Sequence, residues 1–312
     1  MTSKILDEIR DLGNHPWKRN KVYEDKVKWN RLWTSMDILT DTNKAIASFF
    51  EIKIEPHKRE NLLYVYGLLQ AIFVQQDCLN SLNLVLFQKE IDFKKHPVLH
   101  QLRELRNSLI GHPTDFKREK KYSFHLVLSD SITKDAFEYI SYYPDSHNLA
   151  KGLNRIEIKT IIEQQDSYAS EILNNVKIEL EKEIKNHMEQ FKDKKLADEI
   201  HSSISYHFSK LYENSNSYYP LIKLNFNTIE ETYEKLKGGI TKRYNSISAL
   251  QGVEDTCKNI DYIIKSLKIK LIDRNEIDQM DTYIYIDAFR KEMFEFFDMI
   301  YEIDKEFASK GS

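Results

Sequence analysis

The feature that most constrains the fold is the segment of residues 59–88, where apolar side chains recur at helical spacing on nearly every side. The apolar positions are Leu62, Leu63, Tyr66, Leu69, Ile72, Phe73, Leu79, Leu82, Leu86 and Phe87. A helix that is apolar almost all round must be covered by other elements, as at the centre of a helical bundle. Gln75, Gln76 and Asp77 interrupt it. We interpret them first as a polar strip facing solvent or a loop, and second as residues that orient Arg106 or His112, which lie further along the chain.

Glycine and proline are scarce, which favours long helices with few tight turns. The 312 residues include 8 Gly and 6 Pro, and 41% are hydrophobic, enough for a substantial core. We therefore predict a mainly α fold, with one exception. Residues 122–129 alternate with period two, residues 137–143 can form a hairpin partner, and residues 155–158 add a short extended piece. The sequence thus predicts a small β element at about 122–158.

The remaining pattern is helical and sets the expected domain organisation. Further helices are expected at residues 5–12, 22–34, 37–50, 160–212, 228–270 and 276–308. Gly238 and Gly239 are expected to break one of them, and residues 214–220 to form a loop. We predict a helical domain with the small β element over residues 1–165 and a helical region of unknown role over residues 166–312.

Charge and cysteine usage limit the function classes. A net charge of −3 excludes a wholesale electrostatic clamp on nucleic acid, so any RNA binding must be local, transient or dependent on a partner. Cys78 and Cys257 lack metal-ligand spacing and predict reduced thiols. No hydrophobic signal segment is present and no stretch is expected to approach a membrane span. We expect a soluble, cytoplasmic protein without a membrane partner.

The most informative stretch for function is residues 97–114. Four apolar residues form a stripe at helical spacing: Val98, Leu102, Leu105 and Leu109. Gly111 followed by Pro113 is a stop signal, so this helix should end near Ile110. Arg106 lies beside the stripe, and His112 is expected at or just past the helix end. A fixed cation and a titratable imidazole at one helix end suit phosphate chemistry.

The run Arg106-Asn107-Ser108-Leu109-Ile110-Gly111-His112 resembles the motif of the HEPN superfamily. In these all-helical domains an Arg, a polar neighbour and a His four to six residues beyond the Arg lie late in a helix. Many members are metal-independent ribonucleases whose site forms at a dimer interface, and many act in toxin–antitoxin or anti-phage systems. The resemblance implies an HEPN-like helical bundle, an RNA substrate, no metal or organic cofactor, and an antitoxin or regulatory protein as a further partner.

The chemistry of RNA cleavage also favours two copies of the motif. Attack by the 2′-hydroxyl needs one group to remove a proton, another to protonate the leaving 5′-oxygen, and positive charge against the phosphorane. One histidine cannot readily do both proton transfers at once, whereas a two-fold homodimer supplies two. We expect Arg106 to hold the scissile phosphate, His112 to move protons, and Asn107 to orient His112 or the phosphate.

A non-catalytic alternative stays open. Arg106 can pair with acids near Glu104, and His112 can bond the last carbonyls of its own helix. The domain would then be an HEPN-like helical module that binds nucleotides or a protein partner. The charged run of residues 117–121 is interpreted as a solvated face, or as a contact to RNA phosphates. The sequence contains no phosphate-binding loop, dinucleotide fingerprint, HExxH or GxSxG motif.

Overall fold

A computed structural model describes residues 2–55, 57–114, 116–118, 121–143, 150–214, 219–272 and 279–309. Most of these residues are helical, which confirms the mainly α prediction. The chain divides into two compact units: unit 1 is Met1–Leu12 with Asp25–Leu180, and unit 2 is Gly13–Glu24 with Glu181–Ser312. The division between residues 180 and 181 and the expected domain boundary between residues 165 and 166 lie within one long helix.

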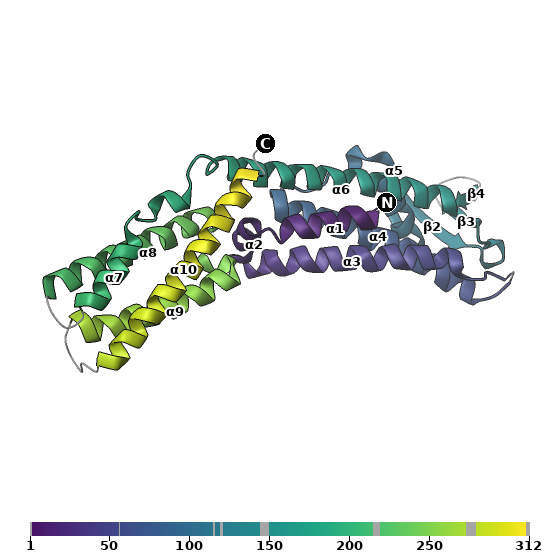
Figure 1. The fold of residues 1–312 in the computed structure, drawn as a ribbon. Coiled ribbons are helices and arrows are strands. Elements are labelled where there is room, and N and C mark those ends of the chain that lie inside the picture. Colours follow the sequence, from purple (N-terminus) through teal and green to yellow (C-terminus); the bar gives the residue numbers. More distant parts are fainter. Residues whose placement is uncertain are drawn as a thin grey trace. The chain divides into compact units, whose positions relative to one another are not determined.

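Unit 1 is a set of long helices with a small sheet (Figure 1). Its described helices are α1 (Thr2–Gly13), α3 (Lys26–Glu51), α4 (Glu60–Phe87), α5 (Pro97–Arg106) and the first part of α6 (Ile158–Glu189). Polar contacts tie α1 to two neighbours. Arg10 bonds Asp37 of α3 at 3.0 Å, and Lys177 of α6 bonds Glu8 at 2.7 Å.

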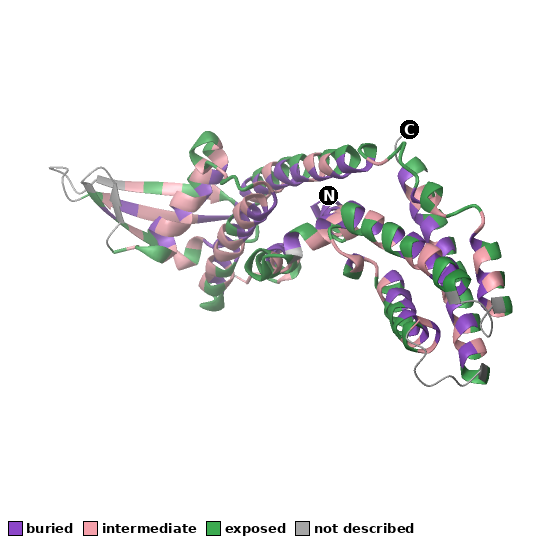
Figure 2. Ribbon diagram, turned by 90° about the vertical axis from the view of Figure 1, so that its left-hand side faces the viewer, coloured by how far each residue is buried: buried purple, intermediate pink, exposed green. Residues whose placement is uncertain are grey.

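Helix α4 is the core helix of unit 1, as its apolar sequence predicts. Figure 2 shows buried positions recurring along the long helices, with exposed positions on their other sides. By length and composition α4 can also cross a membrane, alone among the described helices, which corrects the expectation that no stretch approaches a span. Half of its most apolar window is buried inside the protein, as in a core helix.

Two of the three polar residues in the middle of α4, Gln75 and Gln76, do not face solvent, so the first interpretation was wrong for them, whereas Asp77 is exposed. Both glutamines are buried, in a chain of side-chain amides. Gln75 donates to Asn43 of α3 at 2.7 Å and accepts from Gln165 of α6 at 2.7 Å. Gln76 donates to Gln165 at 2.9 Å and to the Leu99 carbonyl of α5 at 3.3 Å. The two glutamines are therefore an internal brace that joins α4 to three other helices.

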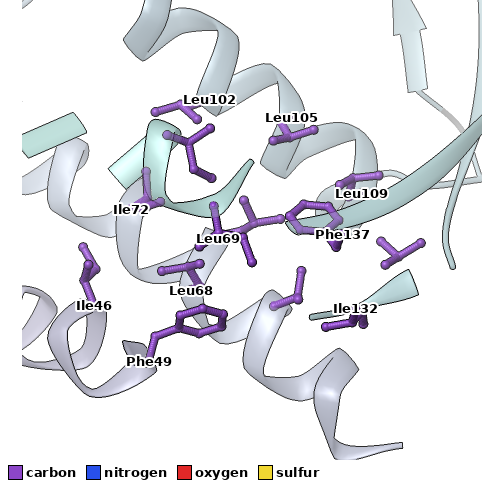
Figure 3. Close-up of a cluster of buried hydrophobic side chains, with 14 residues drawn as sticks. Ile46, Phe49, Leu68, Leu69, Ile72, Leu102, Leu105, Leu109, Ile132 and Phe137 are labelled. Atoms are coloured by element: carbon purple, nitrogen blue, oxygen red, sulfur yellow. The ribbon is translucent and has the colours of Figure 1, made fainter. Parts of the chain in front are cut away.

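The apolar stripe of α5 packs into the core against α4 and the sheet (Figure 3). Leu102, Leu105 and Leu109 are buried in one cluster with residues of α3, α4 and the sheet. The α4 and sheet members labelled in Figure 3 are Leu68, Leu69, Ile72 and Phe137. This packing fixes which side of α5 remains available for polar groups.

A small antiparallel sheet follows α5, as predicted. Its strands are β1 (Phe116–Arg118), β2 (Lys121–Val127), β3 (Ala136–Tyr143) and β4 (Ala150–Glu157), paired in that order. The short extended piece expected at residues 155–158 is the end of the longer β4. The side chains of the charged run, residues 117–121, lie outside the described residues, so their contact with RNA stays a prediction.

Unit 2 is helical throughout the part of it that the structure describes. Its helices are α2 (Pro16–Tyr23), α7 (Ile204–Asn214), α8 (Tyr219–Tyr244), α9 (Gln251–Leu267), α10 (Gln279–Ser309) and the end of α6. The predicted break at Gly238 and Gly239 was wrong, because α8 continues through both. A Cβ at Gly239 would overlap the Leu196 side chain, so this glycine permits a close approach of chain segments. The chain turns instead at Asn245, which has a φ of 63°.

A buried ion pair holds the end of α8 in unit 2. The Arg243 side chain is 2% exposed, and its Nη1 lies 2.7 Å from Asp304 Oδ1 on α10. The same carboxylate accepts from the backbone N–H groups of Leu196 and Ala197 at 3.0 and 2.9 Å. Arg243 Nη2 donates to the Lys194 carbonyl. Each charge is thus met by several partners, as a buried pair requires.

We predict that Arg243→Ala lowers the free energy of unfolding by about 3–5 kcal/mol, because it leaves the Asp304 carboxylate buried without its counter-charge. Equilibrium urea unfolding followed by circular dichroism measures this loss. The control is Lys237→Ala, which removes the more exposed pair with Asp261 and should cost about 0–1 kcal/mol. Equal losses in the two variants would contradict this role for the buried pair.

Candidate functional site

The motif helix ends in an unusual turn. Helix α5 ends at Arg106, and a π-helical turn follows at Asn107–Gly111. The backbone N–H of His112 closes this turn by donating to the Asn107 carbonyl at 2.7 Å. The helical path therefore ends close to Ile110, as predicted, but by a wider turn than the sequence indicated. Single π turns are frequent at functional sites.

Arg106 is held in one position by α4. Its Nε donates to Gln70 Oε1 at 3.0 Å, its Nη1 donates to Asn107 Oδ1 at 3.0 Å, and its guanidinium carbon lies 4.3 Å from the centre of the Phe73 ring. Both acceptors are neutral amides. None of the described residues makes an ion pair with Arg106. The alternative in which Arg106 pairs with acids near Glu104 is therefore not observed. The positive charge is positioned but not neutralised.

Arg103, one turn earlier, provides the contrast. Its guanidinium also lies over Phe73, at 4.2 Å, and over Phe93, at 4.7 Å. Its Nη1 lies 2.7 Å from Asp77 Oδ1, so this charge is neutralised by a carboxylate. Asp77 therefore contacts Arg103 of the motif helix and neither Arg106 nor His112, so the second interpretation of the α4 polar residues is not observed among the described residues.

Asn107 and His112 take different places around Arg106. The Asn107 side chain contacts Arg106, while its link to His112 runs through the backbone. His112 is exposed, and its ring makes no hydrogen bond to the part of the chain that the structure describes. The alternative in which the His112 ring bonds the last helix carbonyls is therefore not observed. The backbone N–H of His112, and not its ring, bonds a carbonyl of this turn.

Gly111 leaves room for the guanidinium. A Cβ built at Gly111 would lie 3.0 Å from Arg106 Nη1 and 3.6 Å from Asn107 Oδ1. The Arg106 guanidinium therefore lies directly against the residue that precedes His112. The motif thus places the Arg106 guanidinium next to the backbone segment that leads into His112.

We predict that Gly111→Ala displaces the Arg106 guanidinium while the fold is retained, because the crowded atom is the end of a flexible side chain. Side-chain NMR of the Arg106 Nε–H, assigned with Arg106→Lys, should show this resonance shifted in Gly111→Ala. Gly238→Ala is the control, since a Cβ there meets nothing within 4 Å and should leave the resonance unchanged. An unshifted resonance in Gly111→Ala would contradict the close approach.

Sequence reasoning missed the residues that hold Arg106. Gln70 and Phe73 lie three residues apart on α4, and Asp77 follows one turn later on the same face. The sequence signal that could have indicated them was the presence of polar Gln70 and Asp77 in a largely apolar helix. Nothing in the sequence said which helix this face would meet.

A cavity of about 530 Å³ lies on the other side of α5, between this helix, the sheet and the start of α6. Its lining includes Tyr122, Tyr139 and Tyr143 from the sheet, and Glu104 from α5. His125 lies in its wall, with its ring nitrogens 2.9 Å from Ser123 Oγ and 3.0 Å from Ser141 Oγ. Burial lowers the pKa of His125, because desolvation disfavours the imidazolium.

We predict that the folded His125 titrates below the ordinary histidine pKa of about 6.5. As the pH falls, the unfolded chain takes up this proton at a higher pH than the folded chain does. The contribution of His125 to the free energy of unfolding is therefore fully present above about pH 6.5 and is lost as the pH falls through the folded pKa. Histidine ring NMR, assigned with His125→Asn, measures the midpoint. A midpoint at or above that of free histidine would contradict the burial of this ring.

No metal centre is evident among the residues that the structure describes. No group of three or more His, Cys, Asp or Glu side chains there is arranged to hold an ion. Cys78 and Cys257 are free and buried, and burial raises the pKa of the Cys78 thiol to about 11. Neither cysteine is a candidate nucleophile or ligand.

Comparisons with models of known protein families, with curated proteins and with solved structures find no match. The resemblance to the HEPN superfamily therefore rests on the sequence motif alone.

Proposed function

We propose that this protein is a metal-independent endoribonuclease of the HEPN type. The observation that carries the proposal is the Arg106 guanidinium, held by the neutral acceptors Gln70 and Asn107 against Gly111, the residue before an exposed His112. A guanidinium without a carboxylate partner can take a phosphate as its anion, and its planar fork suits two phosphate oxygens. An exposed imidazole can reach a substrate.

The proposed reaction uses the RNA's own 2′-hydroxyl as nucleophile. One imidazole removes the 2′ proton as the 2′-oxygen bonds to phosphorus, and another protonates the 5′-oxygen as the P–O5′ bond breaks. The guanidinium stabilises the additional negative charge of the phosphorane. The products are a 2′,3′-cyclic phosphate and a free 5′-hydroxyl, and no water is consumed in this step.

Two copies of the chain would supply the two imidazoles. Each copy contributes one Arg106 and one His112, and a two-fold axis near the motif would bring both pairs into one cleft. The exposure of His112 supports this arrangement, since a second copy can approach it. Asn107 acts in this proposal on Arg106, whose Nη1 it binds, more directly than on His112.

The proposed setting follows from the same resemblance. An HEPN-type ribonuclease of this kind would act in the cytoplasm as a toxin or anti-phage effector, with an antitoxin or regulatory protein as its partner. Unit 2 would then sense, inhibit or recruit. The alternative is a non-catalytic HEPN-like module that binds nucleotides or a protein through the same face.

Metal-free RNA cleavage tests the proposal. In buffer with EDTA, the wild type should cut total RNA and leave 2′,3′-cyclic phosphate ends, detected by mass spectrometry. His112→Ala should lower the rate by about 10²–10⁴-fold, the usual contribution of an acid–base group. The control is His57→Ala, an exposed histidine of unit 1 that pairs with Asp130. Equal degradation by wild type and His112→Ala would remove the catalytic assignment and favour the binding module.

Mixing wild type with His112→Ala tests the shared cleft. The mixed dimer keeps both guanidinium groups but only one imidazole, and one imidazole cannot readily make both proton transfers at once. Mixed dimers, followed by native mass spectrometry, should therefore cleave RNA far more slowly than wild-type dimers, so that activity falls faster than the share of wild-type chains. Activity that falls only in proportion to that share would contradict a site built from two copies.

A further inference from the structure

We propose that the cavity between α5, the sheet and α6 is a base pocket that selects guanine in the RNA next to the cleaved phosphate. This inference rests on the proposed function and names the specificity of the same site. The pocket is separate from the Arg106 contacts but shares the motif helix with them. Its volume of about 530 Å³ is in the range of small-molecule sites.

The sheet side of the pocket is aromatic. Tyr122, Tyr139 and Tyr143 line it, together with apolar side chains such as Ile156. Tyr122 and Tyr143 are 42% and 45% exposed, so the aromatic lining reaches the solvent. Tyrosine rings provide faces on which an unstacked base can pack, the usual way in which proteins bind single-stranded RNA. The composition therefore favours a planar, aromatic ligand.

The charge of the lining decides which part of a nucleotide enters. No lysine or arginine is among the described residues that line the cavity, and Glu104 brings a negative charge. His125 adds no positive charge, because burial lowers its pKa and favours the neutral ring. The Glu104 carboxylate therefore favours a base with hydrogen-bond donors on its edge.

Glu104 selects among the bases. It is half-buried and forms no ion pair with the described part of the chain, so its two oxygens can accept hydrogen bonds from a ligand. Guanine presents two neighbouring donors, N1–H and the 2-amino group, that match a carboxylate. Uracil presents one N–H between two carbonyls, and those carbonyls would face the carboxylate. Gln101 and Gln164, also in the lining, can bond the remaining polar edge.

The pocket and the proposed cleavage site lie on the same helix, with Glu104 between them. Glu104 also lines a second hollow of about 420 Å³, together with His100, Arg103 and Asn107, and its lining also includes Glu90, Asp92 and Lys94. At about 100° per residue, the helix places Glu104 between the base pocket and His100, Arg103 and Asn107, and Arg106 beyond Arg103. An RNA strand that crosses α5 can thus insert a base on one side of Glu104 and lay a phosphate toward Arg106 on the other.

Nucleoside binding tests the pocket without any cleavage. Calorimetry of the full chain should show that guanosine binds about tenfold or more tightly than inosine, which lacks only the 2-amino group, because a hydrogen bond to a charged acceptor is lost. Uridine should bind more weakly still.

Glu104→Gln should remove the difference between guanosine and inosine. Glu163→Gln, an exposed carboxylate on α6, is the matched control and should keep it.

The outcomes separate the two proposals. Guanosine selectivity that depends on Glu104, without RNA cleavage, would uphold the pocket and overturn the ribonuclease. RNA cleavage without a preference for guanine, in a protein that binds no nucleoside, would overturn the pocket alone. Tighter binding of uridine or adenosine than of guanosine would also overturn it. If both proposals hold, cleavage maps next to guanines in wild type, and Glu104→Gln lowers this preference about tenfold or more.

Discussion

The chain of buried amides in α4 is the constraint on which the rest of unit 1 depends. Gln75 and Gln76 are buried, and their side chains bond α3, α5 and α6 through every polar atom except Gln76 Oε1, which has no partner among the described residues. A rotation of α4 would leave several buried amide groups without partners, each costing about 1–3 kcal/mol. The register of α4 is thus fixed, and with it the direction in which Gln70 and Phe73 face the motif helix.

Much of this architecture could be predicted from local patterns. The apolar periodicity of α4, the leucine stripe of α5 and the alternation in β2 are each visible within one segment, because burial on one side leaves a repeat in the sequence. The burial of Gln76 is not visible in this way. Its partner Gln165 lies far along the chain, and only the packing of two helices brings the two amides together. Gly239 is similar, since the side chain that excludes a Cβ there belongs to Leu196.

Contacts between distant segments also limited what the sequence could predict about the candidate site. The sequence indicated Arg106, Asn107 and His112 because they lie within one short helical segment. It could not indicate which helix would bind the guanidinium, nor that Gly13–Glu24 would belong to unit 2. Both are set by contacts between distant segments. The part of the site that recurs as a motif was therefore predictable, and the part that positions it was not.

Local charge matters more here than the net charge of −3. Two guanidinium groups share the Phe73 ring, and Asp77 neutralises only that of Arg103. The cluster therefore keeps one positive charge, and that charge is at Arg106. Because Gln70 and Asn107 already fix this group, binding an anion there costs little additional side-chain entropy. In the proposed site, a single phosphate would therefore find a cation that is already positioned, although the chain is acidic overall.

The π turn sets the relation between the cation and the imidazole. In an α-helix the residue after Gly111 would follow at about 100° per residue, whereas a π turn is wider and delays each step around the axis. The closing bond from His112 to Asn107 spans five residues, so the extra residue is accommodated inside the motif itself. Gly111 then lies against Arg106, and His112 leaves the helix exposed. A regular helical end would turn His112 to another side of α5. This turn therefore determines where the spacing in the sequence places the two groups. The Arg106 guanidinium is held in position, and the His112 ring is exposed, where a substrate could meet it.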